Sequence, residues 1–177
     1  MAAGSTYTPI ATTTLGSSAT DYTFTSISSA YTDLVLVISA YGSGADGNSI
    51  LVQVGNGSID TGSNYSYTAL SGNGTTAYSD RGSSLAYGRL SSRGGLSNSS
   101  SYPGVIIAHF QNYSNTTTNK TLLSRSNLLG ASYPAVESVV TLWRSTSAIN
   151  TIKIYPVAGE SWATGSTFTL YGIQAAT

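Results

Sequence analysis

The end of the chain alternates strictly between apolar and polar residues, and this alternation limits what the chain can fold into. Ile152 and Ile154 share one face of a first run, and Phe168 and Leu170 share one face of a second. A period of two residues is typical of a half-buried strand and does not fit a helix. The chain is therefore predicted to end in two strands.

Similar short runs recur along the chain, and no segment has a convincing helical period. The runs are Tyr7–Leu15, Asp21–Ile27, Tyr31–Tyr41, Ser49–Val54, Gly104–Asn112, Lys120–Asn127 and Val136–Arg144. We predict an all-β, single-domain jelly-roll or β-sandwich of about ten strands. Residues 1–15 would form an N-terminal arm and first strand, and residues 16–177 the sandwich. An up-and-down barrel is the less favoured alternative.

Two segments carry more specific expectations. Tyr31–Tyr41 is apolar on both faces, which predicts a central strand covered on both sides by a second sheet and a loop, or by a second subunit. Residues 55–104 are rich in Gly, Ser, Asn and Tyr and are predicted to be a loop-rich excursion with strand-like pieces at Tyr65–Leu70 and Leu85–Leu90. Within it, Asn56-Gly57 and Asn73-Gly74 are hairpin signals.

Composition limits the chemistry. The chain has no cysteine, which excludes disulfides and thiolate chemistry. Seven basic and seven acidic residues cancel, so no net field favours nucleic acid or a membrane. Charged residues make up 8% of the chain, against a usual value of about 25%. A surface of hydroxyls and amides suits a protein that packs against other proteins. The alternative is that Ser, Thr, Asn and Gly are abundant only because they are compatible with strands and turns.

Few residues qualify for catalysis or metal binding. His109 is the one histidine, and a lone histidine in a strand is more often structural than catalytic. Glu137 and Glu160 are candidates for a glycosidase pair, but spacing alone does not bring them together. Asp46–Asn48 matches part of a calcium loop but lacks the later ligands, so the alternative left is a cation bound at the surface. We predict no cofactor.

Arginine and tyrosine gather in one part of the chain. The residues are Arg81, Arg89 and Arg93, with Tyr78, Tyr87 and Tyr102 nearby. A protein interface is the favoured interpretation, ahead of solvated surface and nucleic-acid binding. Trp143 is predicted to be a core or subunit contact. Trp162 lies in a Gly- and Ser-rich turn and is the candidate for an exposed contact to a sugar.

The C-terminal segment also resembles the ending of many tailed-phage virion proteins. The matching positions are Ile149, Ile152, Ile154, Gly165, Ser166, Phe168, Leu170, Tyr171, Gly172 and Ile173. The opening, Tyr7–Ile10 and then Asp33–Leu36, looks similar as well. The proteins that it most resembles are jelly-roll capsid decoration (cement) proteins, including those of phages that infect cyanobacteria.

The resemblance implies a non-enzymatic homotrimer that binds the major capsid protein on the outside of the head. It implies a virion protein, assembled in the host cytoplasm, with no membrane or nucleic-acid partner. On this hypothesis, Tyr7, Pro9 and Ile10 of an N-terminal arm, Ala2–Ile10, contact the capsid or a neighbouring subunit. The alternative is a tail or fibre module that binds a host-surface glycan or receptor through Trp162 and the middle loops. A jelly-roll glycosidase ranks last.

Overall fold

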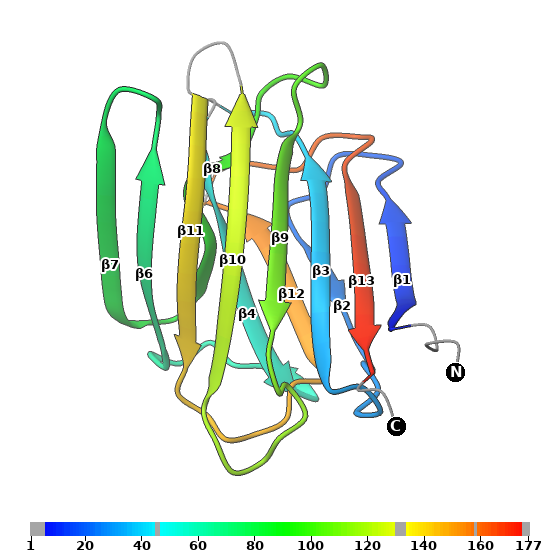
Figure 1. The fold of residues 1–177 in the computed structure, drawn as a ribbon. Helices are drawn as coiled ribbons and strands as arrows, with labels where there is room; N and C mark the ends of the chain where they lie inside the picture. The colour runs from blue at the N-terminus through cyan, green and yellow to red at the C-terminus, as the bar shows by residue number, and fades with distance from the viewer. Residues whose placement is uncertain (1–5, 45–46, 130–133, 158, 175–177) are drawn as a thin grey trace.

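The computed structural model describes residues 6–44, 47–129, 134–157 and 159–174. These residues form an all-β sandwich of two antiparallel sheets, which confirms the predicted fold class (Figure 1). Strands β1 to β13 lie within the described ranges, more than the ten expected. Across these ranges, no helix is long and apolar enough to span a membrane.

Eight strands form the larger sheet. In spatial order they are β1 (Tyr7–Thr14), β13 (Thr167–Ile173), β3 (Asp33–Ala40), β9 (Gly104–Phe110), β10 (Lys120–Leu129), β11 (Pro134–Trp143), β6 (Tyr65–Gly72) and β7 (Ala77–Leu85). Every neighbouring pair is antiparallel. Figure 1 shows these strands side by side in front of the smaller sheet. The two predicted C-terminal strands end up in different sheets.

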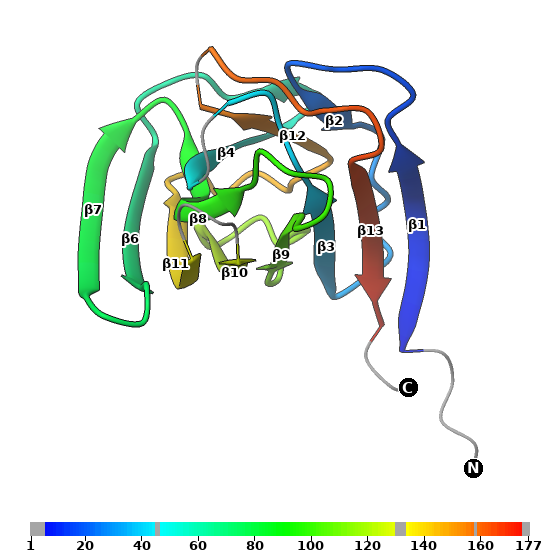
Figure 2. The same cartoon turned by 90° about the horizontal axis from the view of Figure 1, so that it is seen from above.

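The smaller sheet holds the remaining strands. In spatial order they are β2 (Tyr22–Phe24), β12 (Thr151–Pro156), β4 (Asn48–Asn56) and β5 (Ser58–Ile59), while β8 (Gly88–Leu96) pairs with β4 off this path. Seen from above, the two sheets form separate layers, with β8 beside β11 and β10 (Figure 2). The core lies between the layers.

The alternation seen in the sequence decides which side chains enter that core. Ile152 and Ile154 of β12 face Phe168 and Leu170 of β13 across one buried cluster. Burying each of these side chains contributes about 1.5–3 kcal/mol. The same alternation points every second residue of each sheet away from the core. The outward faces are therefore fixed once the core is known.

The apolar run in β3 is covered differently from what its sequence predicted. Its inward residues Leu34, Leu36 and Ile38 are in the core, whereas Val35 faces away from it and is still only 4% exposed. Val35 stands between Tyr171 of β13 and His109 of β9 in the register. Large side chains of the same sheet thus flank Val35 on this face.

Within residues 55–104, the predicted strand-like piece Tyr65–Leu70 is confirmed as part of β6, and Leu85–Leu90 overlaps β8, but the loop-rich excursion predicted around them is wrong. This stretch contains β5, β6, β7 and β8. The hairpin signals within it are confirmed, because Gly57 and Gly74 take φ values of 85° and 90° at the β4–β5 and β6–β7 turns. Polar residues dominate β7 because it is an edge strand without a fully buried position.

Pro9 does not end the first strand. Tyr7, Pro9 and Ile10 lie within β1, an edge strand that pairs with β13. The register shifts between Pro9 and Ala11. Proline lacks the N–H of a ladder hydrogen bond, and an edge strand with a bulge accommodates it. These residues are therefore part of the sheet.

Candidate functional site

The outer face of the larger sheet exposes apolar side chains over three neighbouring strands. Leu70 of β6 and Val136 of β11 are 64% and 65% exposed, and Leu123 of β10 and Val140 of β11 are also exposed. Leu123 stands opposite Val140, and Leu70 stands opposite Ser138 of β11. Cross-strand partners share a face, so these side chains form one surface. We call it the outer apolar face.

The charges on this face are positive. Arg125 of β10 stands between Ile107 of β9 and Ser138 of β11, and Arg81 of β7 stands opposite Thr68 of β6. Strands β6, β7, β9, β10 and β11 contain two carboxylates, Asp80 and Glu137, and both take part in hydrogen bonds on the inward side. The outer apolar face therefore carries arginine without a carboxylate from these five strands.

Two hollows mark this face. One, of about 260 Å³, is lined by Ile107, His109, Leu123, Ser124, Arg125 and Ser138. The other, of about 270 Å³, is lined by Ser66, Tyr67, Thr68, Arg81, Gly82, Ser83, Val140 and Leu142. Each hollow thus combines an apolar side chain with an arginine.

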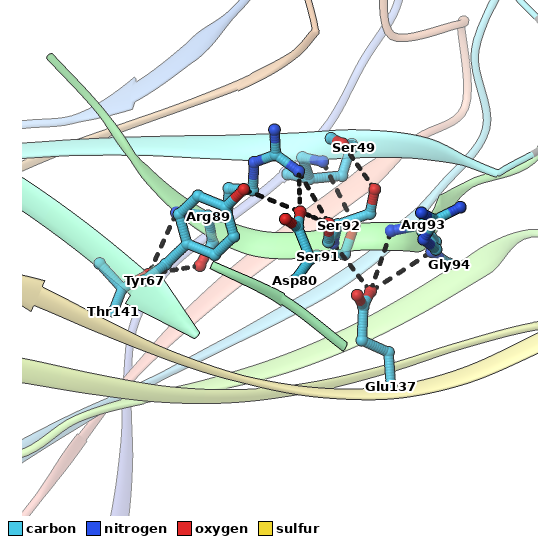
Figure 3. A network of polar contacts seen from close by, with 11 residues as sticks. Ser49, Tyr67, Asp80, Arg89, Ser91, Ser92, Arg93, Gly94, Glu137 and Thr141 are labelled. Carbon is cyan, nitrogen blue, oxygen red and sulfur yellow. Dashed lines mark hydrogen bonds and ion pairs between the residues drawn. The ribbon is translucent and has the colours of Figure 1, made fainter. Parts of the chain in front are cut away.

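A polar network joins the sheets on the inward side of β6 and β7 (Figure 3). The Asp80 carboxylate accepts hydrogen bonds from the Tyr67 hydroxyl at 2.8 Å and the Ser92 hydroxyl at 3.0 Å. Arg89 lies 3.3 Å from the same oxygen and 4.6 Å above the Tyr67 ring. The network fixes β8 against β6 and β7.

This network shifts the pKa of two of its groups. Partial burial opposes ionisation of Asp80, but hydrogen bonds from Tyr67 and Ser92 and the charge of Arg89 outweigh it and lower the Asp80 pKa. Burial, aided by the hydrogen bond to Asp80, raises the pKa of Tyr67 to about 12. Asp80 is therefore a charged acceptor and Tyr67 a neutral donor near neutral pH.

The Asp80 pKa predicts how acid affects stability. Because the folded pKa lies below the unfolded value of 3.8, ionised Asp80 stabilises the fold above that pH, and the contribution is lost as pH falls through the folded pKa. The stability difference between wild type and Asp80→Asn should be largest near neutral pH and narrow below about pH 4. Urea denaturation across this range measures it. A constant difference would contradict this role of Asp80.

Glu137 is locked into the sandwich. Its side chain is 4% exposed. One carboxylate oxygen, Oε2, accepts hydrogen bonds from the backbone N–H groups of Ser92, Arg93 and Gly94 at 2.8, 3.2 and 3.3 Å (Figure 3). The hydroxyl of Ser126 donates to the same oxygen. Glu137 thus satisfies the backbone of β8 and is closed off from any substrate.

The second glycosidase candidate sits elsewhere. Glu160 follows β12 in a turn and accepts a long hydrogen bond of 3.5 Å from the Ser43 hydroxyl. Since Glu137 is buried between the sheets, the two carboxylates do not form an accessible pair. His109 is half-buried in the hollow beside Leu123. Within the described ranges, no three potential ligands cluster for a metal, and Asp46 of the cation candidate lies outside those ranges.

The structure divides the predicted arginine and tyrosine cluster. Arg89 and Arg93 of β8 line a hollow of about 350 Å³ with Asp80, and Arg93 stacks 4.8 Å above the Tyr78 ring. Arg81 faces the other way, because neighbouring residues of a strand point to opposite faces. Of the remaining two tyrosines, Tyr87 lines a hollow beside the smaller sheet. Tyr102 is exposed in the connection between β8 and β9.

The two tryptophans are both buried. Trp143 is 3% exposed and donates from its indole N–H to Asp60 at 2.7 Å, which confirms a core position. Trp162 is 0% exposed and packs edge-on against Phe168 with ring centres 5.0 Å apart. Its prediction as an exposed sugar contact is wrong, because backbone pairing with Ala19 and Gly42 draws this turn into the core.

Sequence reasoning missed the outer apolar face. Its signal is present in β11, where the outward residues Val136, Val140 and Leu142 are as apolar as the inward ones. Because the inward-facing residues of β11 include Glu137 as well as Val139, the sequence does not show that the face with Val136 is unusually apolar for an outward face. Which of the two faces of such a strand is exposed depends on the strands that pack against it in the folded protein.

Comparisons with known proteins identify no family. No protein-family model and no curated protein matches the chain. Among solved structures, CG-16, a homodimeric agglutinin from chicken liver, aligns with 8% identity over 84% of this chain and 98% of its own, with a TM-score of 0.37. At this identity and TM-score, the agglutinin indicates nothing about what this chain binds.

Proposed function

We propose that this chain is a non-enzymatic structural protein of a tailed-phage virion, a capsid decoration protein. It binds the outside of the head and stabilises the shell. The observation that carries the proposal is the outer apolar face, where Leu70, Leu123, Val136 and Val140 are exposed together. Exposed apolar surfaces of this kind mark protein interaction sites. The resemblance of the C-terminal segment, from Ile149 to Ile173, to the endings of tailed-phage virion proteins supports a role in the virion.

The charge of the outer apolar face favours one partner over another. Two copies placed face to face would bring Arg81 and Arg125 of one near the arginines of the other, with no carboxylate from these strands between them. Like charges in an interface oppose association. A surface of the major capsid protein that combines apolar side chains with Asp or Glu would complement it. The proposed homotrimer would then form through other surfaces of the sandwich.

Decoration needs a large buried contact. Stable interfaces bury about 1,200–2,000 Å² in total, and a few well-packed side chains supply most of the affinity. Leu123 and Val140 stand opposite one another between the two hollows, where a partner's side chains would be enclosed. We expect these two residues to contribute most to binding.

Binding to purified heads that lack the protein tests the proposal. Arg125→Glu and Val140→Asp should each weaken binding at least tenfold, about 1.4 kcal/mol, because one reverses the charge and the other places a carboxylate in the contact. Both residues are outside the core, so the fold should be retained. Ser58→Glu, exposed on β5 of the smaller sheet, is the matched control. Unchanged head occupancy for both variants would sink the proposed face.

The N-terminal contact stays part of the proposal, but its simplest test changes. If the arm made this contact without being part of the sheet, deletion of Ala2–Ile10 would abolish head binding and leave the β fold intact. Because Tyr7 to Pro9 pair with Tyr171 to Ile173 of β13, that deletion would also remove half of an edge strand. Tyr7→Ala is a cleaner variant, since this side chain is exposed.

A further inference from the structure

The largest hollow described lies on the opposite side of the molecule from the outer apolar face. It measures about 520 Å³ and is lined by Thr20, Asp21, Leu51, Tyr87, Lys153, Tyr155, Pro156, Val157, Gly159, Glu160 and Ser161. Lys153 and Tyr155 alternate along β12 with Ile152 and Ile154, which are in the core. They therefore point away from the larger sheet, as do the side chains that share their face.

The lining of this hollow includes two aromatic rings and apolar side chains. Tyr155 of β12 stands opposite Leu51 of β4, which is nearly buried, and Pro156 is buried beside it. Tyr87 adds a second aromatic side chain from the β7–β8 connection. Burial, with a smaller contribution from Tyr87, raises the pKa of Tyr155 to about 12, so its hydroxyl stays protonated.

The charged groups that line this hollow are one ammonium and two carboxylates, and the ammonium is paired with one of the carboxylates. The Lys153 ammonium lies 3.1 Å from the Asp21 carboxylate and 5.5 Å from the centre of the Tyr155 ring. The Glu160 carboxylate adds a hydrogen-bond acceptor on the same rim. The hollow thus offers aromatic rings, a hydroxyl and two carboxylates, with its one cation already paired.

We propose that this hollow binds one ring of a neutral sugar. The apolar C–H face of a pyranose would lie on Tyr155 or Tyr87, and its hydroxyls would donate to Asp21 and Glu160. Ligand sites generally combine an apolar lining with a few polar groups that orient the ligand. An anionic sugar is disfavoured, because the ammonium of Lys153 is paired and Glu160 would repel it.

Sugar binding in this hollow is a separate function from capsid decoration and does not depend on it. A chain that docks through the outer apolar face leaves the outer side of β12 turned away from the capsid, because the two surfaces lie on opposite sheets of the sandwich. The two surfaces can therefore be occupied at once. Sugar binding is measured on the isolated chain, so either proposal can fail without the other.

Titration with a panel of neutral hexoses, pentoses and N-acetylhexosamines, and with hexuronic and sialic acids as anionic sugars, tests the site by calorimetry and saturation-transfer NMR. At least one sugar should bind with a dissociation constant of about 1 mM. Tyr155→Ala should weaken that binding at least tenfold, and Tyr155→Phe should retain most of it, because it keeps the ring. Tyr7→Ala, an exposed tyrosine on β1, is the matched control.

Three results would overturn the sugar site. They are no binding by any panel member up to about 50 mM, equal binding by wild type and Tyr155→Ala, or binding of anionic sugars alone. If Tyr155→Ala fails to fold, judged by circular dichroism, Tyr87→Ala carries the same tenfold expectation. Since Tyr87 lies in a connection between strands, its truncation should cost less stability.

Discussion

Replacing Glu137 with alanine should lower the free energy of unfolding by about 3–5 kcal/mol. The Glu137 carboxylate is the acceptor for the backbone N–H groups of Ser92, Arg93 and Gly94. Its removal leaves buried donors without that acceptor, each at a cost of about 1–3 kcal/mol. Urea denaturation at neutral pH, followed by circular dichroism, measures the loss.

Two variants separate the hydrogen bonds of Glu137 from its charge. Glu137→Gln keeps an oxygen that can accept from the same N–H groups and should lose only about 1–2 kcal/mol. Glu160→Ala, a carboxylate at the surface with one long hydrogen bond, is the control and should change stability by less than about 0.5 kcal/mol. Equal losses in Glu137→Ala and Glu160→Ala would show that Glu137 does not anchor β8.

Trp162→Ala should destabilise the fold by about 3–5 kcal/mol. The indole is fully buried, packs against Phe168, and belongs to a turn whose backbone pairs with Ala19 and Gly42. Truncation would leave a cavity beside Phe168. Thermal and urea denaturation should show the same loss.

Trp162→Phe provides the matched comparison. Phenylalanine keeps an aromatic ring beside Phe168 and removes the indole N–H, which is buried and has no hydrogen-bond partner among the described residues. The loss should therefore be smaller than for alanine, by about 1–2 kcal/mol or more. A Trp162→Ala variant as stable as wild type would show that the side chain is not part of the core, and would revive its role as an exposed contact.

The local pattern of apolar and polar residues was sufficient to predict much of the fold. Alternation predicted β12 and β13 and the choice of Ile152 and Phe168 as core residues, because side-chain direction in a strand depends only on position along the chain. The Asn-Gly turns were predicted for a similarly local reason, since glycine accepts the positive φ at Gly57 and Gly74.

The functional surfaces were harder to predict because each combines residues distant in the sequence. Glu137 was predicted in a strand, but its acceptance of three N–H groups of β8 depends on how the two sheets stack. Trp162 was misplaced because a Gly- and Ser-rich turn is normally exposed, and here pairing with Ala19 and Gly42 buries it.

The sequence by itself determined an all-β chain of low charge, with alternating strands and no thiol chemistry. These properties follow from composition and from the two-residue period of a strand, which need no tertiary contacts. Only the tertiary structure decided which face of each strand is covered. Val140 is exposed and Val139 buried because β8 packs on one side of β11 and no other described strand packs on the other. The same stacking placed the outer apolar face and the tyrosine-lined hollow on opposite sides of the molecule.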